Sequence, residues 1–469
     1  MRRRRTYQLF FLTLINLLLS AQIFSQKLYE TKLLEFNSKE FDEFAPVMFE
    51  NGLLFNSFRK QYIYKTEVDL NEKNINDLYY VTKLEGEKWG TLQFFSKELN
   101  TKNHEGKASL TKDGNTIYFT RFHNDSAGNI FKSIKSGGEW NAPVLISINS
   151  DKYRIKDPCI SADGKKMYFA SMAPGGYGGY DIYVSVFERG DWHTPKNLGP
   201  LVNTKGDEVS PFMHSNGKLY FSSNKLPGLG KFDIFYTREI NGKWIIPKNL
   251  PEPVNSNRDD LYYFPDAKDS TGYFSSNRNR SFDIYSFSSL WPQFGECKPI
   301  QKNEYTFIFF EKGSVDNDTT AWLYEWDFGD GTKARGKKAE AEHTFSGIGQ
   351  YLVQLNVIDT LTGEVLLNED TYPFSVADIE QAYIFCPDSL DQGKAEIFDA
   401  SSSNLPSIKK IDYYFWDFGD GERGTGLNTK HSFNESGDYS IKLCVQAAPD
   451  ENGVVQKACV SKVVSVKSP

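Results

Sequence analysis

The stretch FDIFYTRE, residues 232–239, has three close counterparts elsewhere in the chain. YDIYVSVFE begins at residue 180, FDIYSFS at residue 282 and NIFKSIK at residue 129. The Asp or Asn of this motif recurs every 50–52 residues, at Asp77, Asn129, Asp181, Asp233 and Asp283. A tryptophan follows at Trp89, Trp140, Trp192 and Trp244, and an acidic residue precedes at Glu43, Glu105, Asp157, Glu208 and Asp259. Three sets of residues with one period indicate a structural repeat.

Each repeat contains four short strand-like segments. In the fourth repeat these are VSPFMH, LYFSS, DIFYTRE and WIIPKNL, and the turn between the first two carries Asn-Gly. Asn-Gly and Asp-Gly favour tight hairpins, because glycine adopts positive φ without a steric clash. Four antiparallel strands in about 50 residues are typical of a propeller blade.

The fifth repeat ends after DIYSF and lacks a fourth strand. The segment KLYETKLLEFN, residues 27–37, precedes the first repeat at the place where a fourth strand would stand. We therefore predict that residues near 28–35 pair beside residues 283–287, which closes the ring and removes an open sheet edge. The predicted fold is an all-β chain that begins with a five-bladed β-propeller over residues 26–291.

The repeats also resemble a known family. SADGKKMYFASMAPGGYGGYDIYVS (161–185) and PKNLGPLVNTKGDEVSPF (195–212) are similar to the TolB-like (WD40-like) propeller repeats of bacterial envelope proteins. The resemblance covers about residues 27–290 and implies a location in the cell envelope. The first two repeats depart from the pattern, because Asn129 replaces Asp and the first repeat carries the insertion YIYKTEVDLNEKNIN.

A second motif, WDFGDG, occurs at residues 326–331 and again at 416–421. Each copy is followed by His-x-Phe, Gly-x-Tyr and a strand with apolar residues at every second position. That period is typical of half-buried strands, so we expect two small β-sandwiches. Both resemble the immunoglobulin-like PKD (polycystic kidney disease) domain, with boundaries near 296–376 and 380–467.

Residues 1–25 resemble a secretory signal peptide. Four arginines at residues 2–5 precede an apolar run at residues 9–19, which is short for a bilayer span of about 20 residues. We expect cleavage after Ser25 or after Ala21, and no later segment is long and apolar enough to span a membrane. The chain is thus expected to be extracytoplasmic, in the periplasm or associated with the outer membrane.

Export makes disulfide bonds possible among the five cysteines. Cys444 and Cys459 are equidistant from the turn DENG (450–453), so we predict a bond between them across a hairpin. Cys386 with Cys459 is the main alternative. Cys159 is interpreted as a buried thiol.

The sequence shows no constellation typical of an enzyme. The six histidines form no metal-ligand spacing, and neither a nucleophile elbow nor a phosphate-binding loop occurs. We expect no enzyme activity and no cofactor; calcium at the aspartates of WDFGDG is a weaker alternative. The net charge of −7 disfavours nucleic acid as a partner.

The longer loops of the propeller suggest a partner surface. SMAPGGYGGY (171–180), SSNKLPGLGK (222–231) and SSNRNRS (275–281) are expected around one mouth of the central channel, because loops on a rigid scaffold commonly carry binding residues. The candidate contact residues are Tyr177, Tyr180, Lys225, Lys231, Arg278 and Arg280. Charge reversal at Arg278 and Arg280 is expected to weaken partner capture without a change in stability.

Together these patterns predict a non-enzymatic binding or scaffold protein of the Gram-negative cell envelope, with one or more envelope proteins as partners. The combination of modules resembles proteins around gliding motility and type IX secretion. The alternative is a glycan-binding surface protein whose PKD domains act as spacers.

Overall fold

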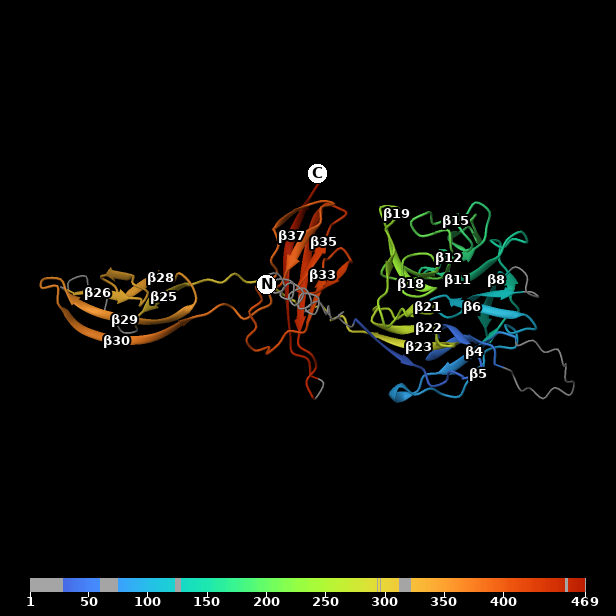
Figure 1. Cartoon of the computed structure of the whole chain (residues 1–469), viewed down its shortest axis with the longest axis horizontal. Coiled ribbons are helices and arrows are strands. Elements are labelled where there is room, and N and C mark those ends of the chain that lie inside the picture. Colours follow the sequence, from blue (N-terminus) through green and yellow to red (C-terminus); the bar gives the residue numbers. More distant parts are fainter. Residues whose placement is uncertain are drawn as a thin grey trace, which may run out of the picture. The chain divides into compact units, whose positions relative to one another are not determined.

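The computed structural model of the chain describes residues 28–59, 75–122, 128–292, 294–295, 297–311, 322–451 and 454–468. The chain forms two compact units, one that ends at Trp291 and one that starts at Pro292. Apart from one 3-10 turn at Glu85–Glu87, the described elements are β-strands (Figure 1), which confirms the all-β prediction. The predicted signal peptide lies outside the described residues. Within those residues, no helix has the length and apolar character needed to cross a membrane.

The first unit is a five-bladed propeller, as predicted. Its first blade contains β2 (Glu43–Phe49), β3 (Gly52–Ser57), β4 (Asp77–Thr82) and β5 (Gln93–Phe94). The second contains β6 (His104–Leu110), β7 (Thr116–Phe122), β8 (Gly128–Ser136), β9 (Glu139–Trp140) and β10 (Val144–Leu145). The third contains β11 (Ile155–Ile160), β12 (Lys166–Ser171), β13 (Asp181–Glu188), β14 (Asp191–Trp192) and β15 (Lys196–Asn197).

The last two blades follow the same plan. The fourth contains β16 (Glu208–Met213), β17 (Lys218–Ser223), β18 (Asp233–Ile240), β19 (Lys243–Trp244) and β20 (Lys248–Asn249). The fifth contains β21 (Asp260–Pro265), β22 (Thr271–Asn279), β23 (Ser281–Ser289) and β1 (Tyr29–Leu33). The first strands of the blades, β2, β6, β11, β16 and β21, contact one another around the centre of the ring.

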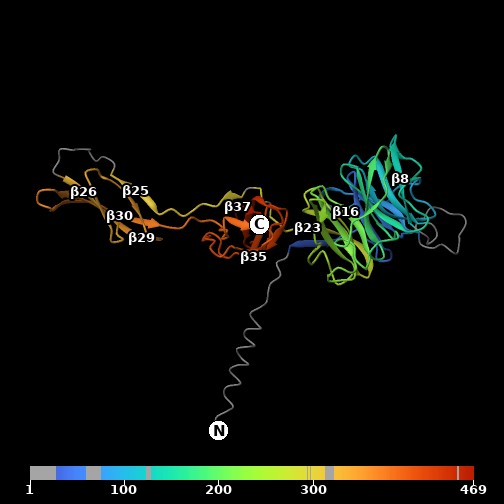
Figure 2. The ribbon, with the colours of Figure 1, turned by 90° about the horizontal axis from the view of Figure 1, so that it is seen from above.

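The N-terminal strand closes the ring. β1 pairs antiparallel with β23, with Tyr29 opposite Ser289 and Leu33 opposite Tyr285. In Figure 2 the dark-blue N-terminal strand accordingly lies beside β23. The predicted pairing of residues near 28–35 with the last repeat is therefore confirmed.

Five asparagines join the blades by one repeated interaction: Asn37, Asn100, Asn149, Asn203 and Asn255. Each side chain accepts a hydrogen bond from a backbone N–H of the preceding blade and donates one to the carbonyl of the same residue. For Asn203 that residue is Ile182, at 2.7 and 3.0 Å. For Asn37 it is Ile284 of the last blade, at 2.8 Å in both directions. The ring is thus closed by the same contact that joins its internal blades.

The pair of hydrogen bonds from each asparagine to one backbone residue, which we call the asparagine clamp, allows a test of ring closure. Asn37→Ala removes the clamp on Ile284 and leaves the Ile284 N–H without a partner, although the carbonyl keeps its bond from the Leu34 N–H. We expect the variant to lower the free energy of unfolding by about 1–3 kcal/mol. Asn203→Ala, which removes the same clamp inside the ring, is the matched control and should cost a similar amount. Urea unfolding of both variants measures the effect. A loss for Asn203→Ala alone would show that the N-terminal segment does not hold the ring closed.

The second unit contains two β-sandwiches. The first pairs β25 (Thr306–Phe310) with β28 (Glu340–Thr344) and sets them against β26 (Trp322–Asp327), β27 (Lys333–Gly336), β29 (Gly349–Asp359) and β30 (Val365–Val376). The second sets β32 (Glu396–Asp399) and β35 (Asn428–His431) against β24 (Lys298–Pro299), β31 (Ser389–Asp391), β33 (Tyr413–Asp417), β34 (Arg423–Thr425), β36 (Gly437–Gln446) and β37 (Lys457–Lys467). Trp326 and Trp416, from the two WDFGDG motifs, are buried in the respective cores.

The first sandwich is inserted into the second. β24 precedes it in the chain but pairs parallel with β37 of the second sandwich, with Lys298 opposite Val460. The chain leaves and returns along two neighbouring segments, because the Gln301 N–H donates to Gln381 Oε1 and the Gln381 amide donates to the Gln301 carbonyl. The residues just before the first sandwich therefore complete a sheet of the second.

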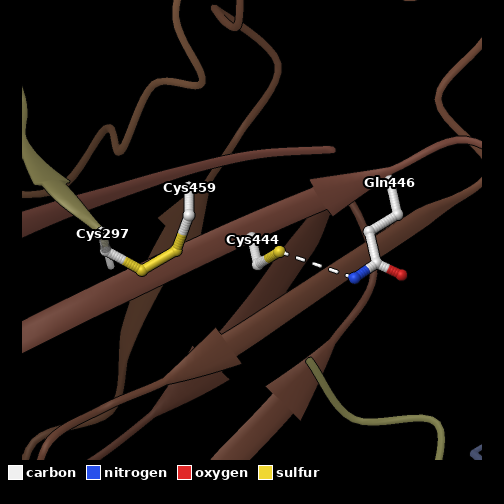
Figure 3. The surroundings of a disulfide bond; sticks show 4 residues. All are labelled: Cys297, Cys444, Gln446 and Cys459. Carbon is white, nitrogen blue, oxygen red and sulfur yellow. Dashed lines mark hydrogen bonds between the residues drawn. A yellow bond between two sulfur atoms is a disulfide. The ribbon is translucent and has the colours of Figure 1, made fainter. Parts of the chain in front are cut away.

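The predicted Cys444–Cys459 disulfide is wrong, and so is the Cys386–Cys459 alternative. Cys459 is bonded to Cys297, 162 residues away, while Cys386 and Cys444 are buried free thiols. Figure 3 shows this arrangement, with Gln446 Nε2 donating to Cys444 Sγ. Cys444 does lie opposite Cys459 in the β36–β37 hairpin, but the parallel β24–β37 pairing brings Cys297 beside Cys459 with the Cα atoms 4.6 Å apart.

The disulfide can be tested by mutation and by mass spectrometry. We expect non-reduced peptides to link Cys297 with Cys459, and Cys297→Ser to cost about 2–5 kcal/mol of stability, because the bond closes a long loop. Cys444→Ala keeps the bond and serves as the control. A linked Cys444–Cys459 peptide would contradict the assignment.

Candidate functional site

The five first strands share an irregularity at the central channel. In each, the pairing with the second strand skips two residues, which is a β-bulge. The first bulged residues are Ala45, Gly106, Asp157, Ser210 and Tyr262, and φ is positive, between 54° and 57°, at the four that are not glycine. This conformation is uncommon outside glycine, and hydrogen bonds hold it here: the Asp157 N–H donates to Thr120 Oγ1 and the Ser210 N–H to Asp157 Oδ2.

Lys107 follows the glycine of the second blade and crosses the channel. Its Nζ donates to the carbonyls of Pro158 and Pro211, on the third and fourth blades, at 3.0 and 2.8 Å. The side chain is buried, and it forms no ion pair with any residue that the structure describes. Burial lowers the pKa of Lys107, and the nearby Cys159 and Asp157 offset only part of this effect.

Lys107 belongs to the lining of an open cavity of about 420 Å³, which we call the cup. The lining combines cationic and aromatic side chains from four blades: Phe44, Phe58, Asn76, His104, Gly106, Lys107, Phe122, Arg154, Lys156, Asp157 and Tyr262. The Phe44 ring lies 5.7 Å from that of Tyr262 and 6.1 Å from that of Phe58. With three cations and one carboxylate among its described residues, this part of the lining is positive in a chain of net charge −7.

Asn76 gives the cup an unsatisfied acceptor. Its amide nitrogen donates to the Glu105 carbonyl at 2.7 Å, and its backbone N–H donates to His104 Nδ1 at 3.1 Å. The residue is 5% exposed, yet its Oδ1 has no hydrogen-bond partner. Buried polar atoms are nearly always paired, so this oxygen is an unusual unpaired acceptor in a residue of the cup wall.

The predicted contact residues do not line the cup. Tyr180 borders it indirectly, because Lys156 Nζ lies 4.6 Å from the centre of its ring. Tyr177, Lys225, Lys231 and Arg280 are exposed. Their role as partner contacts stays a prediction. The cup itself was missed, because its residues lie at strand ends and bulges rather than in the long loops.

Arg278 proves to be a structural residue. Its guanidinium forms an ion pair of 2.7 Å with the buried Asp260 and donates to the carbonyls of Pro253 and Val254. Reversal of its charge would leave Asp260 buried beside another carboxylate. From these contacts we expect reversal of Arg278 to lower stability, in contrast to the expectation from the sequence.

The acidic repeat occupies a regular position in four blades. Glu43, Glu105, Glu208 and Asp260 stand opposite residues at or near the ends of the second strands, and Ile155 takes this place in the third blade. The sequence pattern assigns Asp157 and Asp259 to this position, and they are two residues and one residue away from Ile155 and Asp260. Each carboxylate accepts a hydrogen bond from the linker that precedes it, as Glu208 does from the N–H and hydroxyl of Thr204.

These carboxylates interact with the aspartates that begin the third strands. Burial and the charge of Glu105, to which Asp77 hydrogen-bonds, raise the pKa of Asp77 to about 7. Burial, with Glu43 and Asp42, raises the pKa of Asp283 to about 6. In the second blade Asn129 stands at the position of Asp77, and in the third blade Ile155 stands at the position of the acidic residue. The chain therefore lacks both acids of the pair at one blade junction.

The WDFGDG motifs use their aspartates internally. In the first sandwich Asp330 Oδ2 contacts His343 Nε2 at 2.8 Å, and the ring of His343 stacks on Phe328 at 3.9 Å. Asp420 and His431 repeat this contact at 2.7 Å in the second sandwich. Within the described residues no three His, Cys, Asp or Glu side chains gather as a metal-ligand set.

Comparisons with known proteins support the two kinds of module to different degrees. The family model "PKD domain" matches residues 297–368 and 380–466, so the PKD resemblance is confirmed for both sandwiches. TolB from Acinetobacter baumannii is similar in structure over 61% of this chain and 57% of its own, with 14% identity and a TM-score of 0.31. The match thus spans little more than half of the TolB chain.

Two further solved structures are similar to just over half of this chain. An α-L-arabinofuranosidase from Podospora anserina matches 56% of this chain and 97% of its own, at 11% identity and a TM-score of 0.38. A protein of unknown function from Dyadobacter fermentans matches 56% and 99%, at 9% identity and a TM-score of 0.35. Likenesses at this level say nothing about what this chain binds or catalyses.

The junction carboxylates predict a pH effect. The pKa of Asp77 is raised in the folded state, so the folded protein binds more protons than the unfolded chain between about pH 4 and 7, and stability falls as pH rises through that range. Asp77→Asn, which reproduces Asn129, should therefore gain about 1–3 kcal/mol relative to the wild type between pH 5 and pH 8. Urea unfolding at both pH values measures this gain.

Asp113→Asn is the control for that experiment, because Asp113 is exposed and hydrogen bonds from Thr111 and Asn115 lower its pKa. The change in unfolding free energy that Asp113→Asn causes should be the same at pH 5 and at pH 8. If the stability of Asp77→Asn relative to the wild type were equally constant, the junction pair would not share a proton.

Proposed function

We propose that the protein is a non-enzymatic binding or scaffold protein of the Gram-negative cell envelope, and that the cup is its contact site for an envelope protein. The cup carries this proposal. It combines a cavity of about 420 Å³, aromatic walls, three cations and an unpaired buried acceptor in one place. Ligand sites in proteins are typically cavities of about 300–1,000 Å³ with apolar walls and a few polar groups.

The side chains of the cup favour binding over catalysis. The described part of its lining contains one carboxylate, Asp157, whereas most glycoside hydrolases use a pair. Asp157 is already engaged with the Ser210 N–H and with Lys156. Among the residues that the structure describes, the lining contains no serine, threonine or cysteine, and Nδ1 of His104 accepts a backbone N–H. A nucleophile with its base is therefore not assembled there.

The second unit supports an extracytoplasmic location. A disulfide between Cys297 and Cys459 fits an oxidising compartment such as the periplasm or the cell surface. The PKD domains then act as presenting or spacing modules for the propeller. An association with gliding motility or type IX secretion machinery is the finer form of this proposal and rests on the combination of modules alone.

A glycan-binding surface protein is the second candidate. It is favoured by the aromatic rings of the cup, because sugar rings stack on such faces. Protein contact is preferred here, since Phe44, Phe58 and Phe122 offer no polar group to the hydroxyls of a sugar.

Affinity capture from detergent-solubilised envelopes tests the proposal. The double variant Arg154→Gln, Lys156→Gln removes two cations from the cup, and we expect it to retain at most a tenth of the envelope protein that the wild type captures. Lys112→Gln, Lys165→Gln is the matched control. It also removes two positive charges, but from the short turns between first and second strands, outside the cup. Quantitative mass spectrometry and a parallel melting curve provide the measurement.

Equal capture by the two double variants would show that the cup is not the contact site. Retention of the wild type by purified envelope glycan, in place of a protein, would favour the second candidate.

A further inference from the structure

We propose that the cup recognises a free carboxylate next to an N–H donor, as is found at the C-terminal end of a protein chain. The inference rests on the proposed function, because it takes the cup as the contact site and specifies what enters it. The observations behind it are the charge of the lining, the unpaired Asn76 oxygen and the apolar walls.

The charge of the lining calls for one anion. Lys107 is buried and bonded only to the carbonyls of Pro158 and Pro211 within the described part of the chain, so no carboxylate is in direct contact with its ammonium. The nearby Asp157 offsets only part of the effect of burial. A buried charge is costly unless it is paired. Asp157 does not supply the pair, because its carboxylate contacts Lys156 at 3.6 Å and the Ser210 N–H at 3.2 Å. A carboxylate that enters the cup would supply it.

The surrounding protein favours a single carboxylate over a polyanion. The whole chain has a net charge of −7, so an extended polyanion is repelled by the protein as a whole. The cationic groups of the cup, Lys107, Arg154 and Lys156, are confined to one cavity. A compact group with one negative charge fits this distribution.

Asn76 adds the requirement for a donor. Its Oδ1 is an unpaired acceptor in a residue that is 5% exposed. Inorganic phosphate and sulfate present mainly acceptors and would leave this oxygen unsatisfied. The last residue of a peptide carries an amide N–H beside its carboxylate, so it can satisfy Asn76 and neutralise Lys107 together.

The aromatic walls of the cup indicate which side chain stands next to the carboxylate of the ligand. Phe44, Phe58, Phe122 and Tyr262 contribute aromatic surface to the cup. An apolar side chain near the peptide end gains from burial against these rings, whereas the hydroxyls of a uronic acid would lose hydrogen bonds with water there. The lining therefore favours a peptide end over an acidic sugar.

The test uses three immobilised hexapeptide libraries and the purified full chain. The first library lacks Asp and Glu and ends in a free carboxylate. The second has the same sequences with an amidated end, and the third is amidated but carries Glu at the last position. We expect the wild type to bind the first library at least tenfold more than the second and the third. Raising the salt concentration should weaken this binding, because the lining is partly exposed.

Variants assign the binding to the cup. Arg154→Gln, Lys156→Gln should reduce the preference for the free carboxylate at least tenfold, and Lys112→Gln, Lys165→Gln should leave it unchanged. Lys107→Met is included with a melting curve, and a folded Lys107→Met protein should also lose the preference.

Equal retention of the first two libraries, or a preference that survives in the Arg154, Lys156 variant, would overturn the inference. Binding of the third library as strongly as the first would also overturn the assignment to a chain end, and would point to a side-chain carboxylate. If cup variants lose the envelope partner while no library is retained, the proposed function stands and the carboxylate inference fails. If the first library is retained but no envelope protein is captured, the carboxylate inference stands and the proposed function fails.

Discussion

The propeller depends on one interaction, the clamp of an asparagine side chain on both backbone groups of a residue in the preceding blade. Near the start of each third strand, one residue bonds its carbonyl to a backbone N–H of the same blade, while its own N–H is bonded to the asparagine. An amide side chain offers one acceptor and two donors, and so it can bind an N–H and a carbonyl of the same residue. Because Asn37 makes this contact with Ile284 across 247 residues, the N-terminal segment is as firmly placed as any internal linker.

The clamp also places the candidate site. Each clamped linker delivers the chain to the start of a first strand, where a buried carboxylate accepts hydrogen bonds from that linker in four of the five blades. One or two residues later the bulge changes the course of the first strand at the channel. Lys107 can therefore reach the carbonyls of Pro158 and Pro211 on two other blades, because the linkers hold the blades in register. The cup is a property of the closed ring, and no single loop contains it.

The sequence allowed the ring to be predicted but not its chemistry. The period, the number of blades and the strand at the N-terminus all follow from residues that recur at fixed spacing. The asparagine clamp had a visible signal, since Asn followed by Ser or Thr occurs at 37, 100, 149, 203 and 255. Arg278 was taken for a surface residue because an arginine in a loop is usually exposed, and only its distance to Asp260 shows otherwise. The disulfide was beyond reach, because the spacing of Cys444 and Cys459 says nothing about a parallel strand that arrives from residue 298.

The bond between Cys297 and Cys459 changes how the chain transmits force. Tension applied between the propeller and the C-terminus would pass from Cys297 through the sulfur atoms directly to Cys459. The 161 residues between the two cysteines form a closed loop that such a pull cannot extend. The first sandwich and most of the second are therefore shielded from mechanical unfolding, and the load is borne by the chain before Cys297 and beyond Cys459. Reduction of this one bond would place both PKD domains in series with the propeller and make the tether longer and softer.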